Sequence, residues 1–387
     1  MLLIQKAAVL TGTGKNYACA DVLVGDDGLI AAVGEGLSVP QGACVLDASG
    51  LTLSPGMIDA HCHVGIDEEG LGWEGSDDNE CTEPSTPFLR AMDAINPKDR
   101  GLREALCHGI TTVCTGPGSG NVIAGDFIIM KTHGRTIEEM TVKQPAAMKA
   151  AFGENPRRVY SGQGKTPATR MGTALVFRRA IIEAMNYRRK LEQGAKDPEK
   201  MPDRDLRHEA MQPVINGQLP LKIHAHRADD ILTAIRLCKE FGLKYTLDHC
   251  TEGYMIADIL KAENAAVIIG PLLTHRSKIE LTNLSWDAPK TLTEAGVKFA
   301  MMTDHPVVPL KFLPVYVAIA VREGLDEQTA LQCITLNAAE ILGIDDIVGS
   351  IEPGKHADLV LLDGSPLDVA SHVQKVWVKG ELVHERS

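Results

Sequence analysis

Two histidines separated by one residue, His61 and His63, end the apolar segment GMIDAHCHV. Alternate residues of a β-strand point to the same face, so both imidazoles can lie on one side of the chain. The side chain of Cys62 then points to the other side and is not expected to join them. Neutral imidazoles together with a carboxylate are a common ligand set for Zn²⁺. This segment is therefore the first candidate for a metal site.

Residues of the same kind occur where other apolar segments end. PLKIHAH ends on His224 and His226, KYTLDHC contains His249, and VKFAMMTD ends on Asp304. One histidine at a strand end is more often a hydrogen-bonded core residue than a metal ligand. Burying this many polar groups without partners, however, would cost several kcal/mol. A bound metal ion would remove that cost, so the recurrence indicates a metal centre.

The segments that carry these residues alternate with stretches of helical length. GITTVCTG and AAVIIG are nearly continuous in apolar residues and indicate buried parallel strands, as do the segments above. ADDILTAIRLCKEFG and TEGYMIADILKAEN have apolar residues at helical spacing. This alternation predicts an α/β fold, a (β/α)8 TIM barrel over residues 57–345, with catalytic groups at the carboxyl ends of its strands. A polar, charged segment around residues 160–218 predicts a helical excursion from the barrel.

Both ends of the chain have strand-turn-strand patterns. ADVLVGDDGLIAAVG near the start and VQKVWVKGELVHE near the end are examples. We therefore predict that residues 1–56 and 346–387 form one small β-sandwich domain beside the barrel.

Composition narrows the class of protein. Hydrophobic residues make up 44% and charged residues 23% of the chain, as in ordinary globular proteins. A formal net charge of −12 disfavours a nucleic-acid partner. No apolar run approaches the ~20 residues that span a bilayer, and the nine cysteines have no C-x-x-C spacing. We expect a cytoplasmic protein that acts on a small molecule without nucleic acid or membrane; a homo-oligomer would be compatible with these data.

The sequence resembles the amidohydrolase superfamily over nearly its whole length. PGMIDAHCH is similar to the signature of the first barrel strand, HGITTV to the second strand, and GSIEPGKHADLVLLD to the return into the sandwich. Around MKAAFGENPRRVY and TPATRMG the chain looks most similar to the imidazolonepropionase-related group. The resemblance implies a (β/α)8 barrel with a composite β-sandwich.

The resemblance also implies a set of metal ligands. His61 and His63 would hold the more buried ion, and the other ligands would be His224, His249 and Asp304. Asp304 would in addition be the catalytic group that moves the proton.

The fourth strand leaves the number of metal ions open. In the family a carboxylated lysine or a glutamate bridges two ions, or neither is used when one ion suffices. Lys149 lies in an apolar run, where a lysine is costly unless it is neutralised or modified, which suits carboxylation. Glu154, near the strand end, suits a direct carboxylate ligand. We keep both alternatives, and we expect one or two divalent ions, with zinc as the expected metal.

Other residues are candidates for substrate binding. His226 and His305 have no fixed place in the family pattern, and each could line the substrate pocket or be an ordinary hydrogen-bonded histidine. Arg170, Arg276 and Tyr160 follow expected barrel strands and could meet a substrate carboxylate or oxyanion, although a surface role fits each equally well.

The implied chemistry is hydrolysis of a carbon–nitrogen bond in a small molecule, an amide or cyclic amide. A bound divalent ion would lower the pKa of its water toward ~7, and Asp304 would pass that proton to the leaving nitrogen. Deamination of an amidine-like carbon would use much the same site. A catalytically silent barrel scaffold is a third alternative, and the complete set of histidines and aspartate argues against it.

Overall fold

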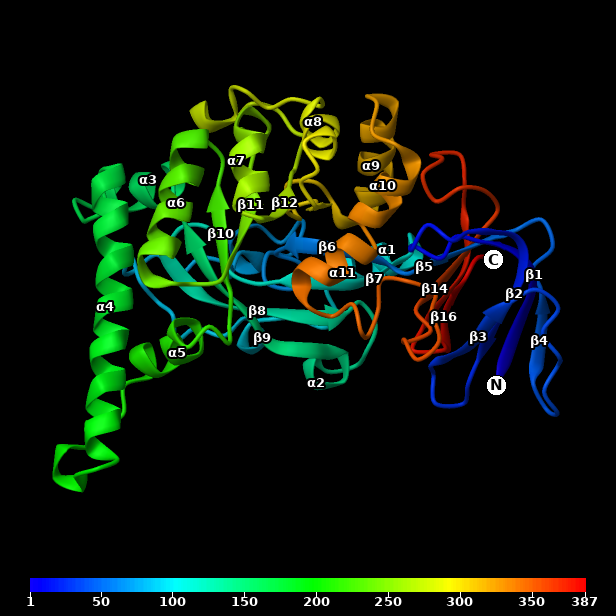
Figure 1. Ribbon diagram of the computed structural model, residues 1–387, viewed down its shortest axis with the longest axis horizontal. Helices are drawn as coiled ribbons and strands as arrows, with labels where there is room; N and C mark the ends of the chain where they lie inside the picture. The colour runs from blue at the N-terminus through cyan, green and yellow to red at the C-terminus, as the bar shows by residue number, and fades with distance from the viewer.

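The chain folds around two β-sheets of eight strands each, and the computed structural model describes all residues 1–387 (Figure 1). The barrel sheet has the strand order β13-β12-β11-β10-β9-β8-β7-β6. Its strands are β6 (Met57–Cys62), β7 (Ile110–Thr115), β8 (Ile123–Lys131), β9 (Thr141–Ala151), β10 (Leu221–Ala225), β11 (Tyr245–His249), β12 (Ala266–Ile269) and β13 (Phe299–Met301). The prediction of an α/β fold with an eight-stranded barrel sheet is therefore confirmed.

The sheet is nearly closed into a barrel. Beyond the end of β13 the chain returns to β6, where the Asp304 amide donates to the His61 carbonyl and the His63 amide donates to the His305 carbonyl, at 3.2 and 2.9 Å. These two bonds hold the two ends of the sheet together on the side where the histidines lie.

One strand corrects the expectation of an all-parallel sheet. β8 pairs antiparallel with both β7 and β9, whereas the pairs β6–β7, β9–β10, β10–β11, β11–β12 and β12–β13 are parallel. Only residues 116–122 connect β7 to β8. A parallel crossover needs about a dozen residues or more, so this short Gly-rich connection forces the chain to reverse.

Helices cover the outside of the barrel sheet (Figure 1). They are α1 (Arg100–Cys107), α2 (Ile137–Met140), α3 (Glu154–Gly162), α4 (Arg170–Gly194), α5 (Leu206–Ile215), α6 (Ala228–Phe241), α7 (Ala257–Ala262), α8 (Ala288–Glu294), α9 (Leu313–Arg322), α10 (Glu327–Cys333) and α11 (Leu336–Leu342). No helix combines the length and the apolar character needed to cross a membrane.

Helix α6 shows why these segments are helical. Ile231, Ala234, Ile235 and Cys238 are buried at spacings of three and four residues, which places them on one face against the sheet. The helix ends at Gly242, whose φ of 66° is the left-handed conformation that a glycine adopts at low cost.

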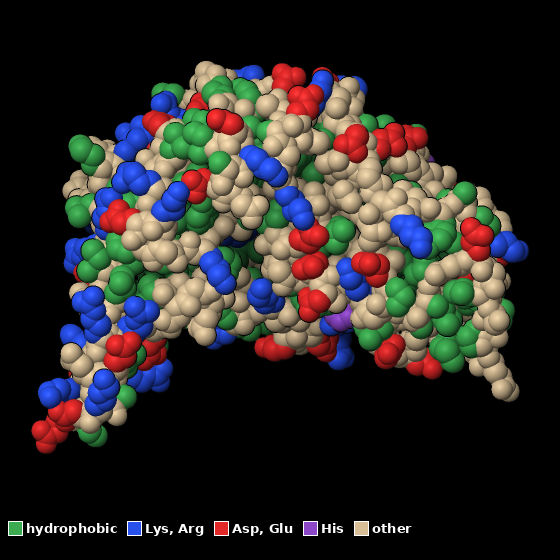
Figure 2. All heavy atoms as spheres, in the orientation of Figure 1, with side chains coloured by type: hydrophobic (Ala, Val, Ile, Leu, Met, Phe, Trp, Pro, Cys, Tyr) green, Lys and Arg blue, Asp and Glu red, His purple; other side chains and the backbone are tan.

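The charged segment forms a long projection. Helix α4 extends away from the barrel, and α5 returns beside it (Figure 1). Figure 2 shows Lys, Arg, Asp and Glu side chains interspersed over the projecting end. Within residues 160–218 the structure has the two helices α4 and α5, and the description of the whole segment as an excursion from the barrel stays a prediction.

Strands from both ends of the chain form the second sheet. Its order is β16-β15-β14-β5-β1-β2-β3, with β4 paired to β1. The strands are β1 (Leu2–Val9), β2 (Tyr17–Val24), β3 (Ile30–Gly34), β4 (Cys44–Asp47), β5 (Thr52–Pro55), β14 (Leu359–Leu362), β15 (Val373–Val378) and β16 (Glu381–Glu385). Hydrogen bonds connect these eight strands into one continuous sheet. That residues 1–56 and 346–387 form a separate sandwich domain stays a prediction.

A buried ion pair joins the two sheets. Lys131, at the end of β8, places its Nζ 2.6 Å from Asp358 Oδ2, and the two side chains are only 1% and 4% exposed. Lys131 also donates to Thr112 Oγ1, while the other oxygen of Asp358 accepts the Lys379 amide. Each charge is therefore compensated only while the two sheets stay in contact.

We expect Lys131→Met to destabilise the protein by about 3–5 kcal/mol, because Asp358 would remain as a buried charge without its partner. Adding Asp358→Asn should recover part of the loss, since the amide oxygen can still accept the Lys379 amide. Urea unfolding midpoints measure both effects. Lys6→Met, which breaks an exposed pair with Asp47, is the control and should leave the midpoint nearly unchanged. An equal shift of the midpoint in Lys6→Met would contradict a special stabilising role of the buried pair of Lys131 and Asp358.

Candidate metal centre

The histidines and the aspartate expected to bind metal come together at one end of the barrel. His61 lies in β6 and His63 directly follows that strand, while His224 lies in β10. His249 is the last residue of β11, and Asp304 follows β13 by three residues. These are the carboxyl ends of the strands, where active sites of such barrels form.

Asp304 Oδ1 lies at the centre of one group of imidazoles. It is 3.3 Å from His63 Nε2, 3.5 Å from His61 Nε2 and 4.0 Å from His249 Nε2. This oxygen is buried and has no hydrogen-bond partner. Bound Zn²⁺ with bonds of about 2.0–2.2 Å keeps its ligand atoms roughly 3.4 Å apart. The ligand atoms of His61, His249 and Asp304 all lie within 4.8 Å of one another, which is close to the spacing of ligands around one ion, and His63 lies beside this group.

The opposite nitrogen of each ring is held in place. His61 Nδ1 lies 2.5 Å from Asp248 Oδ2, His63 Nδ1 lies 2.7 Å from the Gly116 carbonyl, and His249 Nδ1 lies 3.0 Å from the Gly270 carbonyl. An acceptor at Nδ1 fixes the proton there and leaves Nε2 unprotonated. The three Nε2 atoms are thus prepared to bind a cation.

Two of the candidate ligands have strained backbone. His249 has a φ of 69° and Asp304 a φ of 55°, in the left-handed region that non-glycine residues rarely adopt. Such strain persists where surrounding contacts impose it and is common at functional sites. At His249 it has a direct effect. Thr246 Oγ1 donates to Asp248 Oδ1, so these two side chains share one face, and alternation alone would point His249 away from it.

A second group of imidazoles lies beside the first. Ligand atoms of His224, His226 and His249 all lie within 4.8 Å of one another, and the three rings are buried. His224 Nδ1 and His226 Nε2 have no hydrogen-bond partner. Such a group of buried imidazoles could hold a divalent cation; His224 and His249 were predicted as metal ligands, whereas His226 was predicted only to line the substrate pocket or to be an ordinary hydrogen-bonded histidine.

The two fourth-strand candidates occupy different places. Lys149, in β9, is fully buried, and its Nζ lies 3.3 Å from His61 Nε2. Glu154 is the first residue of α3 rather than the end of the strand, and it lines a separate cavity with Arg157 and Arg158. The structure brings Lys149, and not Glu154, to the imidazoles.

Burial and neighbouring charges shift the pKa values in this cluster. Burial lowers the pKa of four imidazoles well below its usual value, those of His61, His224, His226 and His249. Burial also lowers the pKa of Lys149 to about 8. Burial disfavours the charged forms of His63 and Asp304, but the attraction between these two neighbouring groups outweighs it, which raises the pKa of His63 and lowers that of Asp304.

Three of the substrate-binding candidates point away from this cluster. Arg170 begins α4 and binds Asp230 through two nitrogens, at 2.8 and 3.0 Å. Arg276 donates to the carbonyls of Thr282 and Leu284 within its own loop. Tyr160 donates to the Glu83 carbonyl.

The two remaining histidine candidates differ in position. His226 faces the cavity at the metal centre, and its Nδ1 lies 2.8 Å from Thr251 Oγ1. His305 is buried outside that cavity, where its Nδ1 accepts the Leu310 amide.

Sequence reasoning did not identify the charged residues around the ligands. Asp248 binds His61 Nδ1, and Lys222 Nζ lies 3.0 Å from the same carboxylate oxygen. Asp59 accepts the amides of His61 and Thr303 and fixes the two ends of the sheet. Asp248 directly precedes His249 in the chain. The position of Asp248 next to a candidate metal ligand in the sequence could have identified it as part of the site.

The cavity at this end of the barrel is small and polar. It encloses about 240 Å³, and most of the residues that line it are histidine, aspartate, asparagine, serine or threonine. Lys278 is the one lysine on its wall, and no arginine lines it.

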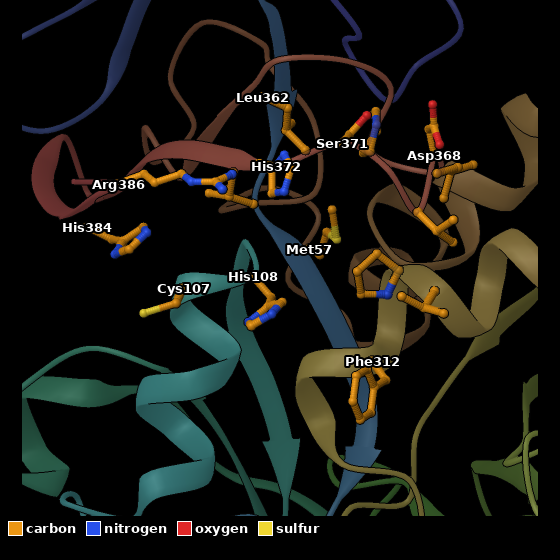
Figure 3. A pocket seen from close by; sticks show the side chains of 16 residues that line it. Met57, Cys107, His108, Phe312, Leu362, Asp368, Ser371, His372, His384 and Arg386 are labelled. Carbon is orange, nitrogen blue, oxygen red and sulfur yellow. The ribbon is translucent and has the colours of Figure 1, made fainter.

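A larger cavity of about 410 Å³ lies elsewhere, between α1, α9 and the terminal sheet (Figure 3). It is lined by Met57, the first residue of β6, and so lies at the opposite end of that strand from His61. It is not the site of the converging imidazoles.

Comparison with known proteins agrees with the geometry. The model of the amidohydrolase family matches residues 52–384. A crystal structure of an amidohydrolase from Thermotoga maritima superposes with a TM-score of 0.97 at 43% identity, covering 100% of both chains. Imidazolonepropionase of Geobacillus kaustophilus is 26% identical over 356 residues, or 82% of this chain and 76% of that protein.

Amidohydrolase TasK of Hapsidospora irregularis is 29% identical over 400 residues. That match covers 95% of this chain but only 40% of the longer relative. The family model covers most of the chain, and its matched residues include every strand of the barrel sheet. The chain belongs to the amidohydrolase family, whose members are hydrolases of carbon–nitrogen bonds.

Proposed function

We propose that the protein is a metal-dependent hydrolase that cleaves an amide or cyclic amide bond of a small polar molecule with an activated water. One observation carries the proposal, the position of Asp304. Its buried, unpartnered Oδ1 lies 3.3 and 3.5 Å from the Nε2 atoms of His63 and His61. A carboxylate placed among neutral imidazoles is both a ligand and a proton acceptor.

The bound metal would supply a water of lowered pKa and would polarise the scissile carbonyl. The remaining steps belong to residues of the chain. Asp304 accepts the proton of the attacking water and donates it to the leaving nitrogen, which needs that proton to depart as an amine. The acceptors at the Nδ1 atoms of His61, His63 and His249 hold the rings so that Asp304 keeps its position.

The cavity supports a small polar substrate. At about 240 Å³ it lies below the usual range of drug-sized ligand pockets, about 300–1,000 Å³. Its wall offers hydrogen-bonding groups from Asn79, Ser119 and Asn155, with the ammonium of Lys278 as a partner for a substrate carboxylate. Of the candidates from the sequence we therefore keep His226 and not Arg170 or Arg276, and we add Lys278 as a second substrate-facing residue.

Lys149 rather than Glu154 is proposed as the fourth-strand residue. Lys149 Nζ is fully buried and lies 3.3 Å from His61 Nε2. The ammonium would first lose one proton to give the neutral amine, and addition of carbon dioxide to that nitrogen, with loss of a second proton, would then give a carbamate. The product is an anion with two oxygens, which would compensate cations bound to the neighbouring imidazoles.

The first prediction concerns Asp304. Asp304→Asn should lower kcat by about 10²–10⁴-fold, because the amide cannot accept or donate the transferred proton. Substrates come from a screen of N-acyl amino acids, lactams and imidazolones with the metal-reconstituted protein. Formation of a carboxylate product identifies amide hydrolysis. Release of ammonia without a carboxylate would instead favour the alternative, deamination of an amidine-like carbon. If the purified wild type contains no metal and a chelator does not change its stability, both the metal-dependent hydrolysis and the deamination are contradicted.

The second prediction separates Lys149 from Glu154. Lys149→Met should lose most activity and bind less metal, and labelled bicarbonate should give a carbamate signal in the wild type and in Glu154→Gln but not in Lys149→Met. Glu154→Gln should keep kcat/KM within a few-fold of wild type, because its side chain lines the other cavity. If Glu154→Gln is the variant that loses metal, the direct carboxylate alternative is correct.

The third prediction concerns Asp248. Asp248→Asn should weaken metal binding by about 10–100-fold, because a charged acceptor behind His61 orients the ring and raises its basicity. Metal Kd values from competition with a chromophoric chelator measure this. Asp258→Asn, an exposed aspartate on α7, is the matched control and should bind metal like the wild type. Equal Kd values for Asp248→Asn and the control would refute the orienting role.

A further inference from the structure

A cavity beside the metal centre is lined mainly by charged side chains. It encloses about 350 Å³, and two carboxylates, Glu154 and Glu280, lie on its wall. Four arginines line it as well, namely Arg157, Arg158, Arg170 and Arg227. The proposed hydrolysis uses none of these side chains.

The beginnings of three helices form this cavity. α3 begins at Glu154, α4 begins at Arg170, and Arg227 directly precedes α6. Arg170 donates to Asp230 of α6, and a Cβ atom on Gly153, just before α3, would lie 3.4 Å from the same carboxylate. Figure 1 shows α3 beside the ends at which α4 and α6 begin. The amino end of a helix carries roughly half a positive charge, so the helices add to the charge of the arginines.

Two of the arginines already have carboxylate partners. Arg170 Nε lies 2.8 Å from Asp230 Oδ1, and Arg227 Nε lies 2.9 Å from Asp229 Oδ1. These pairs hold the beginnings of α4 and α6 in place, and they leave the charge of the cavity to the other residues on its wall.

Arg157 and Arg158 have no such partner. Neither forms an ion pair with a carboxylate, and Arg157 Nε is buried without a hydrogen-bond acceptor. Glu280 is compensated by Lys278, whose Nζ lies 3.6 Å from its Oε1. Glu154 is then the only unpaired carboxylate on the wall, against two unpaired guanidinium groups. A buried donor without an acceptor costs free energy, and an anion would supply the acceptor.

Glu280 forms the partition between this cavity and the catalytic one. It is 2% exposed, and its Oε1 lies 3.6 Å from His226 Nε2 and 3.9 Å from His224 Nε2. Its Oε2 accepts the Glu154 amide at 2.9 Å, where a Cβ atom on Gly153 would lie 2.8 Å from the same oxygen. The two histidines line the catalytic cavity, and the two cavities share no lining residue. A ligand among the arginines is therefore separated from the site of hydrolysis.

We propose that the cavity of four arginines binds the phosphate or carboxylate group of a small anionic molecule, with Arg157 and Arg158 as its partners. A guanidinium group donates two parallel hydrogen bonds to such an oxyanion, which favours arginine where these groups are bound. The three helix ends stabilise negative charge at the same place. The volume of about 350 Å³ lies within the usual range of ligand pockets, about 300–1,000 Å³, so it has space for more than the anionic group.

The test is isothermal titration calorimetry of the full-length protein with inorganic phosphate and, in a separate titration, with succinate. We expect one equivalent of at least one of these anions to bind with a Kd below about 1 mM. Arg157→Met and Arg158→Met should each weaken this binding by about tenfold or more, because charge-assisted hydrogen bonds are lost. Glu154→Gln should strengthen it several-fold, because it removes a repelling charge. Arg179→Met, in an exposed pair with Glu183 on α4, is the matched control and should bind like the wild type.

The outcomes identify the ligand class or overturn the site. Binding of phosphate alone assigns a phosphate-bearing ligand, and binding of succinate alone assigns a carboxylate. The proposal is wrong if the wild type binds neither anion, or if Arg157→Met and Arg158→Met bind both like Arg179→Met.

A titration of chelator-treated protein separates this site from the metal centre, where an anion could bind the metal itself. Binding that disappears with the metal contradicts the proposal, whereas binding that persists supports it even if the protein is not a hydrolase. Thermal unfolding without added anion shows that each variant is folded, and the two independent arginine variants keep the result from depending on one of them.

Discussion

The contact between Asp248 and His61 is the interaction on which the centre depends. Asp248 is completely buried, and a carboxylate in such a place is tolerated only with charged or hydrogen-bonded partners. Lys222 supplies the positive charge, and His61 Nδ1 supplies the proton. The same contact fixes which nitrogen of His61 faces Asp304. The contact of Asp248 with His61 thus compensates the buried carboxylate and orients the candidate metal ligand at the same time.

The part of the site that could be predicted is the part that regular structure determines. Parallel strands bring their carboxyl ends to the same end of a barrel, so polar residues after separate apolar segments were expected to meet there. The structure places His61, His224, His249 and Asp304 together in this way. The α/β class and the barrel sheet followed from the alternation of apolar and helical segments, whereas the family followed from the resemblance of motifs such as PGMIDAHCH; all three are confirmed.

The rest of the site depends on geometry that a regular pattern does not contain. Asp248 and His249 are neighbours in β11, so alternation assigns them to opposite faces. The left-handed backbone of His249 changes this and lets both contribute to the centre. The reversal at β8 likewise depends on the length of one connection. Arg276 seemed a candidate because it follows a strand, but only the path of its loop shows that the guanidinium binds backbone carbonyls.

Glu280 shows how far such non-local determination extends. Nothing in its surroundings in the sequence marks it, because its partners come from β10, from the segment after that strand, and from the start of α3. The Glu154 amide donates to the Glu280 carboxylate, and Gly153 leaves space for it. From the sequence, Glu154 was considered only for its own side chain. This segment therefore positions Glu280 through a backbone amide and the absence of a side chain. Both effects are visible only once the fold has brought residues 153 and 280 together.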